Sequence, residues 1–360
     1  MILKSLVIKN LRSINALNMS FEPGINLIYG RNGIGKTSIL ESIYMLSISR
    51  SFKSHFLKNI ITDGKSGVKI TGKIKDDLNT NLKIEYVKSK TTKTIKINDK
   101  KIKNMSELLG IFPVTILSPD DIGILDNNKE KRSFFNIVLC HTNKRYLHTL
   151  QQYQTAVKQR NSLLQQKASI EYIDLWDEKL SSLAEILWNT KKKFFEEYNQ
   201  IFNVLWKQLE CSYNGTINYN LNQALSKSEY KSKLKSNIEN DIKRGYTNQG
   251  PHRDNIDFYF NSLKIKECGS QGEKKLFLIV VKIAEAIYLG KHLGREPVVL
   301  LDDLFATLDK KRGLKILNLL TNNFQIFVTT TDINAESYFS NKNQLNFIKL
   351  EDHQDICFAA

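Results

Sequence analysis

The stretch Gly30-Arg31-Asn32-Gly33-Ile34-Gly35-Lys36-Thr37-Ser38 decides the fold of this chain of 360 residues. It fits the phosphate-loop pattern G-x-x-x-x-G-K-[ST]. The four defining places hold Gly30, Gly35, Lys36 and Thr37. An apolar run over 25–29 ends at the loop, and residues 38–46 have helical spacing after it. Strand, glycine loop and helix in this order predict a nucleotide-binding α/β fold.

Each part of the loop has a chemical task. Glycines let backbone N–H groups close around phosphate oxygens, and the helix N-terminus adds its positive dipole end. The ammonium of Lys36 is expected on the outer phosphates and the hydroxyl of Thr37 on Mg²⁺. All nine residues of the loop are therefore candidates for nucleotide binding.

A second element, the Walker B pattern, consists of an apolar run over 296–301 followed by Asp302 and Asp303. A central parallel strand is apolar on both faces, so acids at its C-terminal end emerge where ligands bind in α/β sheets. Asp302 is expected to hold Mg²⁺ together with Thr37, and Asp303 to orient or deprotonate the attacking water. Lys36, Asp302 and Asp303 are thus the predicted catalytic residues.

The spacing of the two elements favours one class of P-loop protein. They lie 265 residues apart with a helical region between them, whereas compact nucleoside kinases and GTPases place them much closer together. A head split by a helical insertion is the layout of the ABC-type ATPases of chromosome maintenance. Residues 269–275 resemble their signature motif, in which Ser270 and Gly272 are expected to contact the γ-phosphate held by a second subunit. Residues 306–309 resemble the D-loop of the same interface.

The region between the two elements is predicted to be mainly helical. Apolar residues recur in threes, fours and sevens from Leu139 to Leu164 and again from Trp176 to Leu205, with a break at 167–173. Two antiparallel helices of about 35 residues would form a hairpin arm roughly 50 Å long. We expect an α/β P-loop head of the ABC/SMC type with an inserted helical lobe. The head would occupy 1–125 and 245–360, and the lobe 126–244.

Charge indicates a polyanionic partner. The formal net charge is +16 and the pI about 9.4, so nucleic acid or an anionic membrane surface is the expected kind of partner. Short alternating strands at 68–74, 82–87 and 94–97 carry lysine on one face. Such a sheet could follow a nucleic-acid backbone, although a solvated face is the commoner reason for this pattern. Genome composition is a further alternative, because lysine, asparagine and isoleucine are frequent throughout.

Cysteine usage and hydropathy limit the cellular setting. Cys140, Cys211, Cys268 and Cys357 are widely scattered without a CxxC pair, which argues against a zinc site or a disulfide framework. The first nine residues alternate like a strand, and no stretch of 18 or more apolar residues exists. We therefore expect a cytoplasmic protein without a membrane span.

Further motifs resemble those of the RecF family, bacterial recombination-repair ATPases related to the SMC heads. The resemblance covers the whole chain in order and is closest in the Gly-Pro-His-Arg-Asp sequence at 250–254. The other motifs are Ser118–Asp121 followed by Lys131-Arg132, Gln159–Leu164, Gly245–Asp254, Leu300–Asp309 and Thr329–Asp332.

The chain also departs from the family pattern. Glu273 stands where the signature usually has glutamine, and Thr331 stands where relatives have a switch histidine, so Thr331 is expected only to hydrogen-bond the γ-phosphate. For residues 250–254 two interpretations stay open. They form either a loop near nucleotide or DNA, with Arg253 on a phosphate, or a turn fixed by Gly250-Pro251.

The resemblance implies an ATP-dependent DNA-binding protein of recombinational repair and replication-fork maintenance. Two subunits would close over two ATP molecules with Mg²⁺, DNA would lie in the basic cleft between them, and slow, DNA-stimulated hydrolysis would reopen the dimer. It also implies action at single-stranded gaps and single/double-strand junctions with RecR and RecO, in support of RecA loading and the SOS response. The alternatives are an ABC-transporter-type ATPase subunit and a DNA-binding switch that binds ATP without meaningful turnover.

Overall fold

The computed structural model describes residues 1–53, 60–76, 80–209, 214–220, 225–303, 310–321, 323–332, 345–351 and 355–357. The chain forms two compact units. The first joins Met1–Ile122 with Ser270–Ala360, and the second is Gly123–Gly269. Among the described residues, no helix has the length and apolar character needed to cross a membrane.

The first unit contains two sheets. One consists of β3 (Ile25–Tyr29), β8 (Val114–Leu117), β12 (Val298–Leu301), β13 (Ile326–Thr330) and β14 (Leu345–Lys349). Its strands are all parallel, in the order β14-β3-β13-β12-β8. β8, β12 and β13 are buried along their whole length, as expected for parallel strands covered on both faces.

The other sheet is almost entirely antiparallel. Its strands are β1 (Ile2–Leu11), β2 (Ile14–Ser20), β4 (Gly67–Lys75), β5 (Asn81–Ser89), β6 (Lys93–Ile97), β7 (Lys100–Lys101) and β15 (Asp355–Cys357). They lie in the order β15-β2-β1-β4-β5-β6-β7, and only β15 runs parallel to its neighbour. Inward-facing residues alternate with outward-facing ones along β4, so one face of this sheet is apolar and the other polar.

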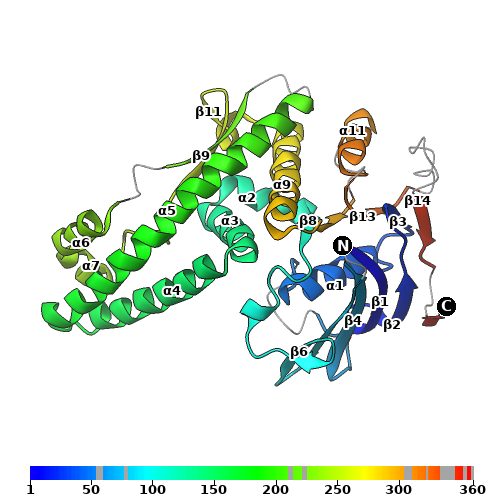
Figure 1. The fold of residues 1–360 in the computed structure, drawn as a ribbon, viewed down its shortest axis with the longest axis horizontal. Coiled ribbons are helices and arrows are strands. Elements are labelled where there is room, and N and C mark those ends of the chain that lie inside the picture. The colour runs from blue at the N-terminus through cyan, green and yellow to red at the C-terminus, as the bar shows by residue number, and fades with distance from the viewer. Residues whose placement is uncertain are drawn as a thin grey trace. The chain divides into compact units, whose positions relative to one another are not determined.

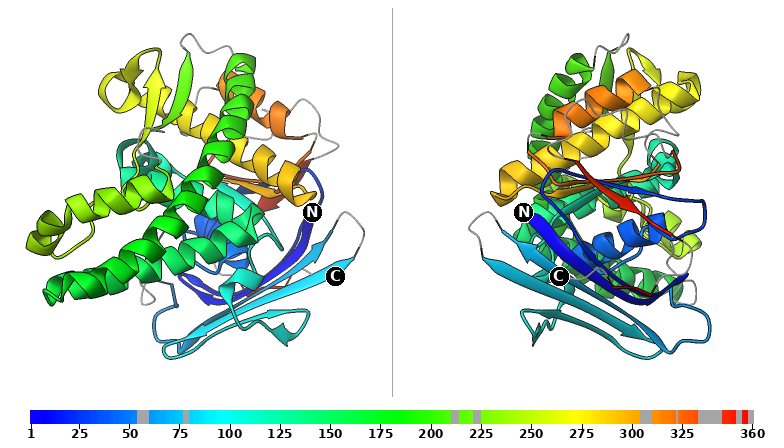
Figure 2. Two further views of the ribbon diagram at one scale, coloured as in Figure 1. Left: turned by 60° about the vertical axis from the view of Figure 1, so that its left-hand side comes forward. Right: turned by 90° about the vertical axis from the view of Figure 1, so that its right-hand side faces the viewer.

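Helix α1 (Lys36–Ile48) lies between the two sheets and contacts strands of both (Figure 1). Eleven of its 13 residues are buried, so the helix is enclosed on all sides rather than buried along one face. It approaches β4 closely at Gly72, where a Cβ atom would lie 2.5 Å from Cδ1 of Leu46. Helices α9 (Gln271–Leu293) and α11 (Lys310–Thr321) cover the opposite face of the parallel sheet (Figures 1 and 2). Two 3-10 helices, η2 (Met105–Glu107) and η3 (Pro119–Ile122), flank β8.

The second unit is a helical lobe with a small sheet. Its helices are α2 (Gly123–Asp126), α3 (Asn128–Thr142), α4 (Lys144–Gln165), α5 (Ile170–Gln208), α6 (Lys227–Ser236), α7 (Ile238–Arg244) and α8 (Ile265–Cys268). The strands β9 (Gly215–Tyr219), β10 (Ile256–Phe260) and β11 (Leu263–Lys264) form an antiparallel sheet. Figure 2 shows α4 and α5 side by side as a hairpin. With 39 residues, α5 is about 58 Å long.

The hairpin differs from the expected one in its first helix. Residues 139–164 carry one apolar series, but Asn143 ends α3 and begins α4, and its side chain accepts a hydrogen bond from the Tyr146 amide at 2.9 Å. Asparagine is among the preferred N-cap residues, so it starts a new helix without disturbing the apolar spacing around it.

The second expected domain boundary also needs correction. The sequence predicts that residues 245–269 belong to the head, whereas in the structure they belong to the second unit. The reason is strand pairing, because Phe258 of β10 lies opposite Ile217 of β9. Pairing between distant segments leaves no local signal in the sequence.

Candidate nucleotide-binding site

The loop between β3 and α1 has the backbone geometry of a phosphate cradle. Gly33 and Gly35 adopt φ angles of +82° and +111°, in the left-handed region that favours glycine. A Cβ atom at Gly35 would also lie 3.3 Å from Cγ1 of Ile14. Gly35 is the N-cap of α1, no side chain caps the helix, and its first turn holds no acid. The first amides of α1 therefore keep their capacity to bind an anion.

Lys36 is held inside the loop. It is 6% exposed, and its Nζ donates to the carbonyl oxygens of Gly30 at 2.8 Å and Arg31 at 2.9 Å. Burial lowers the pKa of Lys36, and the carboxylates of Asp303 and Asp302 act in the opposite direction. The ammonium of Lys36 thus lies between the phosphate loop and the two Walker B acids.

Asp302 joins three segments that are far apart in the sequence. Its Oδ1 accepts hydrogen bonds from Thr37 Oγ1 at 3.0 Å and from Thr329 Oγ1 at 2.8 Å. Because β3, β13 and β12 are neighbours in a parallel sheet, their carboxyl ends meet at one edge. Burial raises the pKa of Asp302, while the bonds from Thr329 and Thr37 and the charge of Lys53 oppose this rise.

Thr329 is the residue of this site that sequence reasoning did not single out. The motif Thr329–Asp332 predicts a contact with the γ-phosphate at Thr331 instead. Thr331 is exposed, and among the described residues no hydrogen bond joins it to the loop or to the two acids. Strand alternation cannot separate the two, because residues two apart share a face; in the structure Thr329 lies within the buried strand β13 beside β12, whereas Thr331 follows its end.

Asp303 has an unusual backbone. Its φ angle is +49°, which a residue other than glycine rarely adopts, and its amide donates to Thr329 Oγ1 at 3.0 Å. The half-buried carboxylate follows the sheet edge where Asp302 lies. Such conformations persist where surrounding contacts hold them, and they cluster at functional sites.

A cavity of about 320 Å³ lies beside the loop. Its lining joins the turn between β1 and β2 to the phosphate loop, and it has polar and apolar parts. The lining includes Ile14, Asn15, Leu17, Gly33, Ile34 and Ile39. This arrangement fits the base and sugar of a nucleotide whose phosphates lie at the loop.

The signature stretch opens α9 at the surface. Ser270 is the N-cap, and its Oγ accepts a bond from the Glu273 amide at 3.3 Å while the Glu273 carboxylate accepts one from the Ser270 amide at 2.8 Å. These reciprocal bonds form a capping box. Glu273, at the position where glutamine was expected, therefore has a structural role at the start of α9. Ser270 and Gly272 are exposed, and a Cβ atom at Gly272 would meet nothing within 4 Å. The expected D-loop at 306–309 lies outside the described residues.

Comparison with known proteins places the chain in a family. The family model described as RecF/RecN/SMC N terminal domain matches residues 2–354. A protein of Azobacteroides pseudotrichonymphae, "DNA replication and repair protein RecF", is 32% identical over 92% of both chains. A protein of the same name from Lachnoclostridium phytofermentans is 32% identical over 95% of both chains. The chain belongs to the RecF family.

Solved structures of the RecF family agree with this assignment. The structure described as the recombination mediator protein RecF-ATPrS in the RecFOR pathway superposes with a TM-score of 0.85 at 27% identity, covering 98% of this chain and 96% of that one. An Smc head domain from Pyrococcus furiosus, at 14% identity and a TM-score of 0.57, shares the fold. The expected ABC/SMC-type head with an inserted helical lobe is confirmed.

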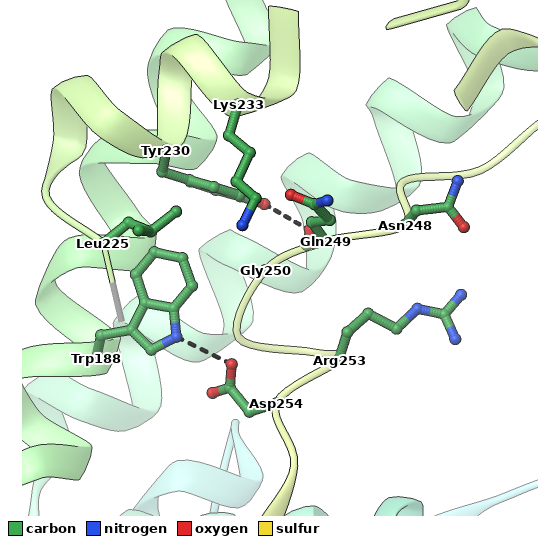
Figure 3. Close-up of a pocket in the computed structure, with 9 residues that line it drawn as sticks. All are labelled: Trp188, Leu225, Tyr230, Lys233, Asn248, Gln249, Gly250, Arg253 and Asp254. Carbon is green, nitrogen blue, oxygen red and sulfur yellow. Dashed lines mark hydrogen bonds between the residues drawn. The ribbon is translucent and has the colours of Figure 1, made fainter. Parts of the chain in front are cut away.

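The RecF-family stretch 245–254 lies in the second unit, where most of it is tied into the lobe. The carboxylate of Asp254 accepts a bond from Trp188 Nε1 at 3.0 Å (Figure 3) and another from Lys191 Nζ at 2.8 Å. His252 Nδ1 lies 2.8 Å from the Tyr153 hydroxyl. At Gly250 a Cβ atom would lie 2.3 Å from the hydroxyl oxygens of both Tyr153 and Tyr230. For these three residues the structure supports the fixed turn.

Arg253 differs from its neighbours in this turn. Its side chain is exposed, lies 5.1 Å from the Tyr246 ring centroid, and lines a cavity of about 230 Å³ with Lys233 and Trp188 (Figure 3). Of the two interpretations of residues 250–254, contact with a phosphate therefore stays open for Arg253 alone.

The preceding motif, Gln159–Leu164, fixes the same turn from α4. Arg160 is fully buried, with Nε 2.5 Å from Asp177 and Nη1 2.6 Å from Asp241, and it also donates to Thr247 Oγ1 at 3.0 Å. Asn161 accepts from the amide of Thr247 at 2.8 Å. The two motifs are thus halves of one hydrogen-bond network inside the lobe.

Proposed function

We propose that this chain is an ATP-dependent DNA-binding ATPase of recombinational repair and replication-fork maintenance. The observation that carries the proposal is the contact of Thr37 with Asp302 at 3.0 Å, across 265 residues of sequence. It unites the phosphate loop with the Walker B acids, as phosphoryl-transfer chemistry requires. ATP is the nucleotide proposed, because the solved relatives are described as RecF-ATP and RecF-ATPrS.

Mg²⁺ fits the oxygen atoms at this edge of the sheet. A hydroxyl and a carboxylate, from Thr37 and Asp302, are hard ligands, and Mg²⁺ commonly takes one or two such groups beside phosphate oxygens and water. The bound ion would neutralise charge on the phosphates. Lys36 would exchange its bonds to backbone carbonyls for the outer phosphates. Asp303 would accept or orient the proton of the attacking water.

The second half of the proposal is a site shared between two copies of the chain. Ser270, Gly272 and Thr331 are exposed, and none of them forms a described hydrogen bond with the phosphate loop of its own chain. We assign them to the γ-phosphate held by the partner of an ATP-dependent homodimer. The uncapped amides of the phosphate loop and the exposed N-terminus of α9 would then face one nucleotide from two sides.

DNA is the proposed polyanion, in the form of single strands, gaps and junctions. The net charge of +16 supports this partner, and the names of the relatives support replication and repair as the setting. In this role the chain would work with RecR and RecO in the cytoplasm, at the nucleoid, and support RecA loading and the SOS response. Hydrolysis would be slow and stimulated by DNA.

ATP turnover against protein concentration, with and without gapped DNA, tests the proposal. A rate per subunit that rises with concentration and rises further with DNA is the expected result. A constant rate that is indifferent to DNA would contradict both the shared site and the DNA partner. Lys36→Ala should abolish nucleotide binding, because it removes the cation that the loop holds.

Ser270→Arg tests the shared site separately. The variant should bind ATP as the wild type does but fail to dimerise with ATP, measured by analytical ultracentrifugation. Ser226→Arg is a matched control, because Ser226 caps α6 through the same kind of capping box with Glu229. Normal dimerisation of the Ser270 variant, or equal loss in both variants, would overturn the shared site.

A further inference from the structure

The antiparallel sheet of the head has a polar face on which lysines stand directly opposite lysines. Strand register pairs Lys9 with Lys69 across β1 and β4, and Lys73 with Lys83 across β4 and β5. Lys96 lies opposite Lys101 across β6 and β7. The six lysines share one face of the sheet, because residues opposite each other across a ladder point the same way. The other face of the sheet carries the apolar residues that pack with α1. We call the six residues the lysine face.

Carboxylates neutralise only part of this charge. Glu85 lies 2.7 Å from Lys69 and 3.5 Å from Lys96, and Asp99 lies 2.8 Å from Lys83. The other three lysines of the face, Lys9, Lys73 and Lys101, are exposed. No carboxylate of the described residues forms an ion pair with them. Six cations thus face two anions.

Three lysines of α6 show the contrasting case, in which every ammonium has a carboxylate partner. On α6 the lysines at 227, 231 and 235 all pair with Glu178 or Asp174. Like charges directly opposite each other destabilise a sheet. A polyanion lying on the face would remove this repulsion.

The side chains between the lysines of β1 and β4 are short. Ser5, Val7 and Thr71 occupy the neighbouring positions of β1 and β4 on the same face. Lys69 and Lys73, four residues apart on β4, are separated by roughly 13 Å, close to the 12 Å width of the major groove of B-DNA. Small side chains between two lysine pairs leave room for a wide, regular polyanion to approach the backbone.

We propose that the lysine face is a docking surface for duplex DNA, held through its phosphates without reading of sequence. The inference rests on the proposed function, since it names the surface that meets the DNA partner. Lysines act there as point charges, so binding would release counterions and weaken steeply with salt. The proposal assigns this task to the head itself and to strands that flank α1.

The test replaces the three lysines without an ion pair, as Lys9→Gln, Lys73→Gln and Lys101→Gln together in the full chain. Fluorescence anisotropy with a 30-base-pair duplex gives the dissociation constant at several salt concentrations, with and without ATP. Loss of three phosphate contacts should lower the magnitude of the slope of log K against log salt by about 2 to 3. The matched control changes Lys192, Lys193 and Lys207 of α5 to glutamine, which removes the same charge from another surface.

The expected result is a reduced slope in the sheet variant, a near wild-type slope in the control, and full rescue by Lys9→Arg, Lys73→Arg and Lys101→Arg. An unchanged slope in the sheet variant, with a wild type that binds duplex strongly, would overturn this inference and leave the proposed function standing. Equal loss in sheet variant and control would also overturn it. A loss confined to a single-stranded probe would refute the duplex assignment. A wild type without salt-dependent DNA binding would refute the proposed function as well.

Discussion

Thr329→Val tests the architecture of the site most directly, because it removes one hydroxyl and keeps the shape of the side chain. The hydroxyl donates to the Asp302 carboxylate at 2.8 Å and accepts from the Asp303 amide at 3.0 Å. A hydrogen bond to a charged group contributes about 1.5–3 kcal/mol. We expect the head to lose about 2–3 kcal/mol, a fall in Tm of roughly 5–10 °C for a unit of this size.

The loss of stability should depend on pH, and the direction of that dependence shows whether Thr329 contacts the ionised form of Asp302. Burial raises the pKa of Asp302, and the bond from Thr329 lowers it, so the variant has a still higher pKa. The difference between wild type and variant is therefore largest above the pKa of Asp302 and shrinks as the pH falls through it. Calorimetry at pH 8 and pH 5 measures both values.

Thr331→Val is the matched control, since Thr331 is exposed two residues further along. Its effect on stability should stay within about 0.5 kcal/mol. An equal fall in Tm for both variants, or a Thr329→Val loss that grows on acidification, would refute the contact with ionised Asp302.

Three further predictions concern positions with close side-chain neighbours or buried charge. Gly250→Ala should destabilise the lobe by about 2–4 kcal/mol, because the new Cβ would meet two tyrosine hydroxyls at 2.3 Å and the φ angle is +128°. Gly272→Ala is the control, because a Cβ atom there faces open space and should leave the Tm unchanged. Equal Tm values for the two variants would contradict this prediction. Arg160→Met should cost about 3–5 kcal/mol in urea unfolding, since two buried carboxylates lose their cation; a change below 1 kcal/mol would count against the network. Burial raises the pKa of Glu285 to about 7, so the wild type should lose roughly 3 kcal/mol between about pH 4.5 and pH 7, whereas Glu285→Gln should show no such loss in parallel unfolding curves.

Local patterns predicted the site better than the fold around it. The order of strand, glycine loop and helix at 25–48 is observed, because glycines at positive φ and an uncapped helix start are properties of neighbouring residues. The buried strand before Asp302 is observed for the same reason. What brings Thr37 to Asp302, the placement of β13 between β3 and β12, depends on pairing between segments hundreds of residues apart.

The remaining differences have the same origin. Thr329 could not be preferred to Thr331 without knowing that β13 lies beside β12 and ends at Thr330. Residues 245–269 looked like a return to the head because strands begin there, yet β10 pairs with β9 inside the lobe. The lysine pattern was visible, but only the register shows that lysine lies opposite lysine.

Gly72 brings helix α1 close to the backbone of β4, a strand whose opposite face carries exposed lysines. On one face its missing side chain lets Leu46 of α1 approach the strand, and on the other face the flanking residues Lys69 and Lys73 are exposed. A single layer of backbone therefore separates the helix that begins at the phosphate loop from the charged surface. A ligand that changed the twist of β4 would therefore be expected to change the packing of Leu46, and with it α1. Amide hydrogen exchange along α1 is the place to detect a ligand bound on the far side of the sheet.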